Sequence, residues 1–375
     1  MSRLFSVDID PKRVYGLDLL RAAAILFVII GHGGHYLPAE WLKVNSFLAF
    51  DGVSLFFVLS GFLIGGIFIR MMDGRKVEGR DILEFWMRRW LRTLPAYLFI
   101  LTVLIILKLS FGEPGPTKYL LKYFLFIQNL YYGHPWFFPE AWSLSVEEWF
   151  YLLTPIIVLL VLRITGASFR QALLWVSVAL IVSITAFRLW RFSLIDVPDI
   201  ETWDMAFRKP VITRLDSLMF GMIGAYIRYY SAELWEKRSL LFFLVGCLIL
   251  VAVQIISVFG LLPVNGIFSC VFSFTAVSLG TLLMLPFLNA LKNGHGRVYS
   301  AVTVISLISY SMYLTNMSLV QGWIIESLHI SSLGAKYLLF WLLTITLSIL
   351  MYKYIERPMM ALREHPLIRE RLSRA

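Results

Sequence analysis

Residues 239–291 contain no Asp, Glu, Lys, Arg or His. This uncharged stretch is long enough for two helices that each cross a bilayer, since one crossing takes about 20 residues. The whole chain is similarly apolar, because 59% of its 375 residues are hydrophobic, compared with about 45–50% in a soluble domain. A soluble helical core cannot bury so many helices that are apolar on every side. The sequence therefore predicts an integral membrane protein.

Hydrophobic segments of spanning length recur along the chain and predict an all-α, polytopic fold with about ten transmembrane helices. The expected helices cover residues 17–35, 50–69, 93–109, 145–162, 171–190, 211–229, 240–259, 267–289, 299–320 and 335–353. The segment 119–131 is shorter and carries Lys122. We expect it to be interfacial or re-entrant, with protein or water around it, because its backbone cannot be left bare in lipid.

Positive charge is distributed unevenly between the predicted loops. If the N-terminus is cytoplasmic, most of the 34 Lys and Arg fall on the cytoplasmic side, as the positive-inside rule requires. The net charge of +10 then reflects basic cytoplasmic loops rather than nucleic-acid binding. We expect both termini to be cytoplasmic, with an N-terminal segment at 1–16, a membrane domain at 17–353 and a short basic tail at 354–375.

The two cysteines, Cys247 and Cys270, both lie in apolar stretches. They form no CxxC pair, have no zinc-binding spacing and offer no disulfide framework. We expect them to be small buried hydrophobic side chains, and we expect no metal site.

The first predicted helix carries ionisable residues on one face. Arg21 and His32 point to within about 20° of each other, and Asp18 lies about 60° from Arg21. We expect an Asp18–Arg21 ion pair and, about 16 Å from Arg21 along the helix, the His32 imidazole. Charges inside a span are costly and usually functional, and histidine exchanges protons near neutral pH. A structural ion pair and a hydrogen-bonded interfacial histidine are the alternative.

Three arginines, Arg88, Arg89 and Arg92, fall within about one helical turn, just before the third predicted helix. A guanidinium group can bind two phosphate oxygens at once, so an arginine cluster suits a phosphate-bearing ligand. The same residues could also be a topology signal that contacts anionic lipid. On physical grounds the two interpretations are evenly balanced.

Two glutamates, Glu147 and Glu148, begin the fourth predicted helix, which Ser143 or Ser145 could cap. Acidic residues are favourable at a helix N-terminus, and this explains one of them more readily than both. In the predicted topology they lie on the outer side with His32. Glu147 could therefore orient the imidazole or stabilise its charged form.

Charged residues near the later helices have two explanations each. Arg214 and Asp216 are two positions apart, so they do not face each other on a helix and each needs a partner elsewhere. For both, acceptor binding and structural pairing are equally good explanations. Arg357 lies at the cytoplasmic end of the last predicted helix, where interface anchoring and donor contact are the alternatives.

Seven stretches, taken together and in order, resemble the acyltransferase family 3 of membrane proteins. They read YGLDLLRAAA at 15–24 followed by His32, GVSLFFVLSGFLI at 52–64, FWMRRWLRTLP at 85–95, AWSLSVEEWFY at 141–151, RLDSLMFG at 214–221, ISYSMYL at 308–314 and YIERP at 354–358. These stretches extend over nearly the whole chain.

The resemblance implies a ten-helix enzyme of the bacterial cytoplasmic (inner) membrane. Such an enzyme uses cytoplasmic acyl-CoA, acetyl-CoA being the expected donor, to acylate a hydroxyl of a surface or secreted saccharide or glycoside. By this resemblance, and with the residues weighed above, the expected catalytic residues are His32 and Glu147. The expected donor-binding residues are Arg21, Arg88, Arg89, Arg92 and Arg357. The expected acceptor-binding residues are Trp142, Glu148, Arg214, Asp216 and Tyr310.

Two positions depart from the family pattern. The second motif usually reads Val-Asp where this chain has Val53 and Ser54, and Asp51 is nearby but out of register. The motif of the ninth helix often ends in a histidine, where this chain has Asn316. Both departures concern the acceptor chemistry more than donor binding.

Two other functional classes stay open. A transporter or flippase for a lipid-linked sugar would make equal use of charge inside the membrane, and a non-catalytic membrane scaffold would bind no coenzyme A. The series of motifs and the lack of evident inverted repeats favour the acyltransferase.

Overall fold

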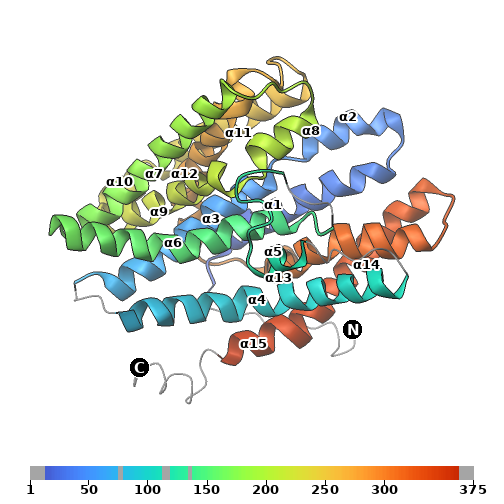
Figure 1. The fold of residues 1–375 in the computed structure, drawn as a ribbon, viewed down its shortest axis with the longest axis horizontal. Helices are drawn as coiled ribbons and strands as arrows, with labels where there is room; N and C mark the ends of the chain where they lie inside the picture. The colour runs from blue at the N-terminus through green and yellow to red at the C-terminus, as the bar shows by residue number, and fades with distance from the viewer. Residues whose placement is uncertain (1–12, 75–78, 112–118, 134–136, 363–375) are drawn as a thin grey trace.

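The computed structural model describes residues 13–74, 79–111, 119–133 and 137–362, and every regular element in these ranges is helical (Figure 1). The predicted all-α fold is therefore confirmed. The α-helices are α1 (Tyr15–Gly33), α2 (Ala39–Leu48), α3 (Gly52–Met72), α4 (Gly79–Ser110), α5 (Leu120–Phe124), α6 (Ala141–Thr165), α7 (Phe169–Phe192), α8 (Ile200–Trp203), α9 (Leu215–Tyr230), α10 (Ala232–Lys237), α11 (Ser239–Val258), α12 (Ser273–Ala290), α13 (Gly296–Thr315), α14 (Leu333–Met351) and α15 (Arg357–Ala361).

Shorter helical turns extend or connect these helices. They are the 3-10 turns η2 (Gly34–Tyr36) and η4 (Val211–Thr213) and the π-helical segments η3 (Asp204–Arg208), η5 (Phe268–Phe272), η6 (Asn316–Ile325) and η7 (Tyr352–Glu356). A π-helical turn shifts the side chains that follow it and is often found at functional sites. In this fold, η6 directly continues α13 and begins at Asn316.

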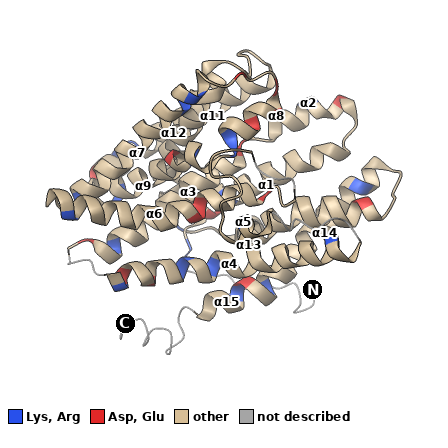
Figure 2. Ribbon diagram, in the orientation of Figure 1, with Lys and Arg blue, Asp and Glu red and all other residues tan. Residues whose placement is uncertain are grey.

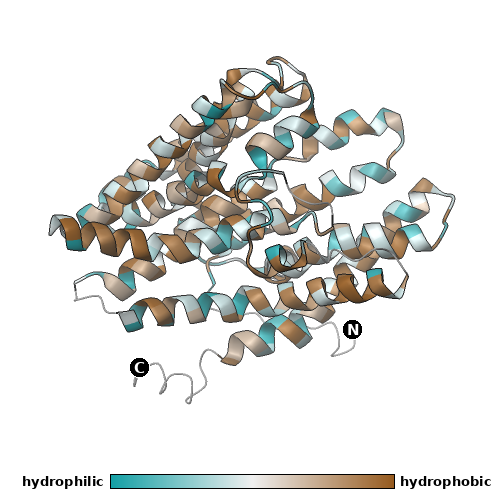
Figure 3. Cartoon of the chain, in the orientation of Figure 1, coloured by the Kyte–Doolittle hydropathy of each residue, from teal (hydrophilic) through white to brown (hydrophobic). Residues whose placement is uncertain are grey.

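Within the described ranges, nine helical stretches are long and apolar enough to cross a membrane. Figure 2 shows ribbon without charge along most of their length, and Figure 3 shows hydrophobic positions recurring on every long helix. The protein is thus a multi-pass membrane protein. The predicted helix at 211–229 is the exception, because it consists of η4 and the shorter, 16-residue α9.

One other prediction needs adjustment, and a second agrees with the structure. The expected helix at 93–109 is part of the longer α4, which begins at Gly79, so Arg88, Arg89 and Arg92 lie on a helix and not in a loop. The segment 119–131 does not span, as expected. It forms the five-residue α5 and then turns back into the bundle, where the side chains of Tyr123 and Asn129 are fully buried.

The long helices lie roughly along the long axis of the molecule (Figure 1). The end of α3, the beginning of α4, the end of α6 and α10 gather at the left edge of this view, while α2 and α8 lie toward the opposite end. Residues 1–12, 75–78 and 363–375 lie outside the described part of the chain. Most of the predicted N-terminal segment, 1–16, and of the predicted tail, 354–375, is therefore not described. Which end of the bundle faces the cytoplasm stays a prediction.

Close contact between α3 and α9 depends on glycine. A Cβ atom at Gly61 would lie 1.9 Å from the carbonyl oxygen of Leu218, and one at Gly221 would lie 2.0 Å from the carbonyl oxygen of Val58. Small residues at such crossings let two helix backbones approach each other inside a membrane. Because Arg214 directly precedes α9, this contact also places Arg214 beside the beginning of α3.

Substitution of Gly61 by Ala should separate α3 from α9. The added methyl group meets backbone rather than a flexible side chain, so we expect a loss of about 1–3 kcal/mol or more and a melting temperature in detergent several degrees lower. Gly66→Ala is the matched control on the same helix, because its Cβ would have only one ordinary contact, 3.5 Å from the end of the Arg70 side chain. Equal melting temperatures for the two variants would contradict the close contact.

Candidate active site

A cavity, called here the inner cavity, lies between α1, α3, α4, α6 and α13. Its charged lining consists of Arg21, Arg89, Arg92 and Glu147. About 90 Å³ of it is open to water, which is room for several water molecules or a narrow chain of atoms. Among the residues predicted from the sequence, the structure thus brings three of the five donor-binding arginines together with Glu147.

Glu147 is held in one orientation by two hydroxyl groups. Its carboxylate accepts a hydrogen bond of 2.8 Å from Ser60 on α3 and one of 2.9 Å from Tyr151, one turn further along α6. Both donors also line the inner cavity. The carboxylate is therefore fixed beside the guanidinium groups, and its hydrogen bonds go to Ser60 and Tyr151, so Asn316 and not Glu147 orients the imidazole. Stabilisation of the charged imidazole by Glu147 stays a prediction.

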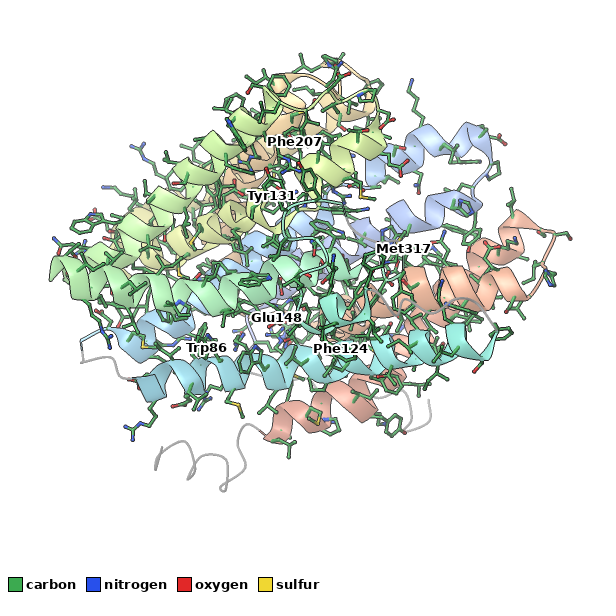
Figure 4. The ribbon with its side chains drawn as sticks, in the orientation of Figure 1. Trp86, Phe124, Tyr131, Glu148, Phe207 and Met317 are labelled. Atoms are coloured by element: carbon green, nitrogen blue, oxygen red, sulfur yellow. The ribbon has the colours of Figure 1, made fainter. Side chains whose placement is uncertain are left out.

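The neighbouring Glu148 is buried and connects helices. It accepts a hydrogen bond of 2.7 Å from Thr93 Oγ1, and the carbonyl oxygen of Thr93 accepts one of 2.8 Å from the hydroxyl of Tyr310. Figure 4 places Glu148 near the centre of the molecule, between α6 and α4. Because Tyr310 lies on α13, these contacts tie three walls of the inner cavity together.

His32 points into the bundle, toward a residue that the sequence marks as a departure from the family. Its Nδ1 lies 2.5 Å from Oδ1 of Asn316, which is fully buried. The amide nitrogen of Asn316 donates to the carbonyl oxygens of Met312 and Tyr313 at 2.9 and 2.8 Å. Oδ1 is thus left to accept, so Nδ1 carries the proton and Nε2 of the neutral imidazole is a free base.

The segment that carries Asn316 is anchored to α6 by the residue preceding that helix. Glu140 accepts hydrogen bonds from the backbone N–H of Ser318 at 2.9 Å and from its hydroxyl at 2.5 Å. Burial raises the pKa of Glu140 to about 7, although the Ser318 donors oppose the shift. The hydroxyl of Tyr313 also donates to the carbonyl oxygen of Glu140, at 3.0 Å. These contacts hold η6, and with it Asn316, in place.

The second departure from the family pattern is explained by a helix cap. Asp51 caps α3 by accepting bonds from the backbone N–H of Ser54 at 3.2 Å and from its hydroxyl at 2.5 Å. A guanidinium N–H of Arg214 donates to that same hydroxyl. Arg214 also lies between two rings, with its guanidinium 5.5 Å from the centre of Phe57 and 4.4 Å from that of Phe274. The carboxylate of Asp51 therefore lies beside Ser54, about one helical turn before the position at which the family pattern has its aspartate.

Arg214 and Asp216 do find separate partners, as their spacing predicts. Asp216 forms an ion pair of 2.7 Å with Arg188 of α7, and both side chains are completely buried. Arg188 further donates to the carbonyl oxygen of Thr213 at 2.9 Å. Asp216 is thus engaged in a structural pair.

Several predicted residues lie apart from the inner cavity. Asp18 pairs with Arg13, which precedes α1, and accepts from Ser306 at 2.7 Å, so the expected Asp18–Arg21 pair is wrong. Arg21 instead lines the cavity. Arg88 is paired with Glu84 one turn earlier on α4, at 2.8 Å.

His32, Arg357 and Trp142 are also outside the lining of the inner cavity. Arg357 is exposed at the beginning of α15. Trp142 is buried, with its ring edge-on to Phe57 and the guanidinium of Arg208 5.2 Å from its centre.

Arg208 is a residue near the site that the sequence did not indicate. It pairs with Asp204 at 2.8 Å, and although burial opposes the shift, the carboxylates of Asp204 and Asp51 raise the pKa of Arg208 above its ordinary value. The positions of residues along η3 could not have predicted that Arg208 lies near Asp51, because Arg208 and Asp51 are far apart in the chain. For Asp51 a signal did exist, because an Asp three positions before Ser54 at a helix start is a typical cap.

No group of three or more His, Cys, Asp or Glu side chains that could hold a metal occurs in the described ranges. The ionisable groups of the candidate site are the imidazole of His32, the carboxylate of Glu147 and the guanidinium groups of Arg21, Arg89 and Arg92.

Comparison with known proteins assigns the chain to a class. A family model described as an acyltransferase domain matches residues 14–353. The chain therefore belongs to this family of membrane acyltransferases, acyltransferase family 3, as the seven motifs predicted.

Two relatives carry more specific names. The O-acetyltransferase OatA of Staphylococcus aureus is 34% identical over 167 residues, which is 41% of this chain and 26% of that protein. The peptidoglycan O-acetyltransferase OatA of Listeria monocytogenes is 32% identical over 167 residues, which is 40% of this chain and 25% of that protein. The aligned part thus spans about a quarter of each relative. No solved structure matches the chain.

Proposed function

We propose that this protein is an O-acyltransferase of the bacterial inner membrane, which transfers an acetyl group from cytoplasmic acetyl-CoA to a hydroxyl of a saccharide or glycoside. The observation that carries the proposal is the His32–Asn316 contact. It leaves Nε2 of a half-buried imidazole free to act as a base, in a chain that belongs to an acyltransferase family. The relatives named as O-acetyltransferases support the transfer of acetyl to oxygen.

The donor would bind at the arginine end of the inner cavity. Arg89 and Arg92 lie in the first half of α4, and Arg21 on α1 lines the same cavity. Guanidinium groups are suited to the phosphates of coenzyme A. The space in the cavity fits a narrow arm and not a nucleotide, so the nucleotide would stay at the surface while the thioester enters.

The transfer itself would need one base and no covalent intermediate on the protein. Nε2 of His32 takes the proton of the acceptor hydroxyl as its oxygen attacks the thioester carbonyl carbon. The carbon–sulfur bond then breaks, and the leaving thiolate recovers the proton from the imidazolium. Asn316 acts as a positioning residue, because its oxygen keeps the Nδ1 proton in place. Glu147, fixed by Ser60 and Tyr151, would balance the arginine charge around the thioester.

The acceptor is proposed from one relative. The Listeria monocytogenes protein is named a peptidoglycan O-acetyltransferase, so a cell-wall saccharide is the first acceptor to test. Glu148, Tyr310 and Arg214 remain candidate contributors to the acceptor end of the site, while Asp216 serves to neutralise Arg188.

Replacement of His32 by Ala should abolish acetyl transfer and leave the fold intact. Loss of a general base typically costs about 100-fold to 10,000-fold in rate. The measurement is transfer of radiolabelled acetyl from acetyl-CoA by protein in lipid nanodiscs. His35→Ala, one turn further along and exposed, is the matched control and should keep the parent rate. Transfer by His32→Ala at the parent rate would refute the role of His32 as the base, whereas no acetyl transfer by the parent protein to any saccharide would favour a transporter or scaffold.

Replacement of Arg92 by Ala should weaken donor binding. Loss of one charge-assisted contact to phosphate is worth about 1.5–3 kcal/mol, so the KM for acetyl-CoA should rise at least about 10-fold. Arg88→Ala is the comparison, because Arg88 is engaged with Glu84 outside the cavity and its loss should change KM little. Equal effects of the two substitutions would instead indicate that the cluster acts only through its total charge.

Replacement of Asn316 should affect the chemical step and not donor binding. In Asn316→Leu, Nδ1 loses its acceptor, and the wrong tautomer of His32 should lower kcat about 10-fold or more while the KM for acetyl-CoA is unchanged. Asn316→Asp keeps an acceptor oxygen opposite Nδ1 and should recover most of the loss. If Asn316→Asp is as stable as Asn316→Leu but does not recover kcat, the acceptor oxygen is not what matters. Asn316 is then only a packing residue.

A further inference from the structure

A second cavity, called here the outer cavity, lies at the end of the bundle away from the arginine cluster. It is bounded by α8, the end of α11, η5, the beginning of α12 and the segment that leads into α3. With a volume of about 410 Å³ it is larger than the inner cavity. The main wall of the outer cavity comes from α8, α11 and η5. None of the seven stretches that resemble the acyltransferase family lies in these three elements.

The walls of the outer cavity are mostly apolar and rigid. Leu250 and Val253 contribute aliphatic surface, while the rings of Trp203 and Phe274 stack with centres 5.6 Å apart and planes 14° from parallel. The indole N–H of Trp203 donates to the carbonyl oxygen of Ser269 at 2.9 Å, which fixes the ring. An ordered water molecule needs two to four polar partners, and such walls supply few. The cavity therefore suits an apolar ligand better than water.

The charged and amide side chains of the outer cavity, Asp51 and Gln254, lie next to the segment that leads into α3, while three serines line it elsewhere. Gln254 lines the cavity, but its amide nitrogen is occupied by the carbonyl oxygens of Ser46 and Phe47, at 2.7 and 3.1 Å. Asp51 also lines it, and its carboxylate, which caps α3, is the one charged group among the described residues of the lining. A ligand with an apolar body and a hydroxyl at one end would thus be oriented with the hydroxyl toward Asp51.

One layer of side chains separates the two cavities. Phe57 lines the inner cavity, Phe274 lines the outer cavity, and the Arg214 guanidinium lies between their rings. In the chain, Asp51 faces the outer cavity and Val53 the inner one. This layer is therefore the place where ligands from the two cavities come closest.

The same segment lies against the helix that carries His32. A Cβ atom at Gly52 would lie 2.1 Å from the carbonyl oxygen of Ala24 on α1, and one at Gly31, the neighbour of His32, would lie 3.4 Å from Cβ of Ala49. The polar end of the outer cavity is thus held directly beside the part of α1 that ends in the imidazole.

We propose that the outer cavity binds the apolar part of the acceptor, so that the acceptor is a glycoside or lipid-linked saccharide with an apolar aglycone rather than a free sugar. This proposal rests on the proposed acyl transfer and names its acceptor class. The aglycone occupies the space beside Val253 and Trp203, and a sugar hydroxyl near Asp51 is directed toward His32.

Acetyl transfer to dodecyl β-glucoside, octyl β-glucoside and free glucose tests the proposal, with the full chain in nanodiscs and each glucoside below its micelle concentration. We expect KM to fall with chain length and glucose to be the poorest acceptor. Val253→Trp, which fills the cavity, should raise the KM for dodecyl β-glucoside at least about 10-fold, as lost burial of several CH₂ groups implies. The KM for acetyl-CoA should not change.

Leu248→Trp is the matched control on α11, because Leu248 is 68% exposed on the lipid-facing side and does not line the cavity. It should behave like the parent. The proposal is overturned if KM is independent of chain length, or if Val253→Trp and Leu248→Trp have the same effect.

A binding experiment separates this proposal from the proposed function. A photoreactive alkyl glucoside should label peptides of α11 and η5 in the parent and not in Val253→Trp, and dodecyl β-glucoside should compete with it. If phospholipid competes equally well, the cavity is a lipid site and the proposal fails. Specific labelling without acetyl transfer to any acceptor would sink the transferase assignment, and the proposed role of the cavity with it, leaving a glycoside-binding site only.

Discussion

Charges buried inside this bundle have to be matched within it, because neither lipid nor a packed interior can solvate them. Arg188 meets this requirement with Asp216, and Arg214 meets it with Ser54 and two aromatic rings. Asp51 completes the series by accepting from Ser54. These contacts join α7, α9, α3 and α12. The layer between the two cavities is therefore also the layer that holds four helices together, and it cannot be loosened without loss of stability.

Properties that depend on many neighbouring residues could be predicted from the sequence. The apolar length of each span is local, so nearly all spans were found. The clustering of Arg88, Arg89 and Arg92 is also local, and two of the three line one cavity. The beginning of α9 was missed because Val211–Thr213 is as apolar as the helix that follows. Only the contacts of Arg214 with α3 show where that helix begins.

Properties that depend on one distant side chain could not be predicted in this way. The partner of Asp18 is Arg13, in the extended segment before α1, and helical geometry says nothing about such a residue. The partner of His32 is Asn316, far away in the chain on a π-helical turn. The family pattern did mark that position, but as a missing histidine. Only the two carbonyl oxygens that bind its amide nitrogen show that Asn316 serves the imidazole as an acceptor.

Two cavities separated by a thin layer have a chemical consequence for a thioester. A reactive acyl donor is also open to attack by water, so a site that admits it must keep water away from the carbonyl carbon. The inner cavity is narrow, and the outer cavity has mostly apolar walls. Under the proposed function, an apolar acceptor would displace what little water the outer cavity holds and bring its own hydroxyl instead. Selection for an acceptor with an apolar part would then also protect the donor, because only such an acceptor fills the space beside Asp51 without carrying water to His32.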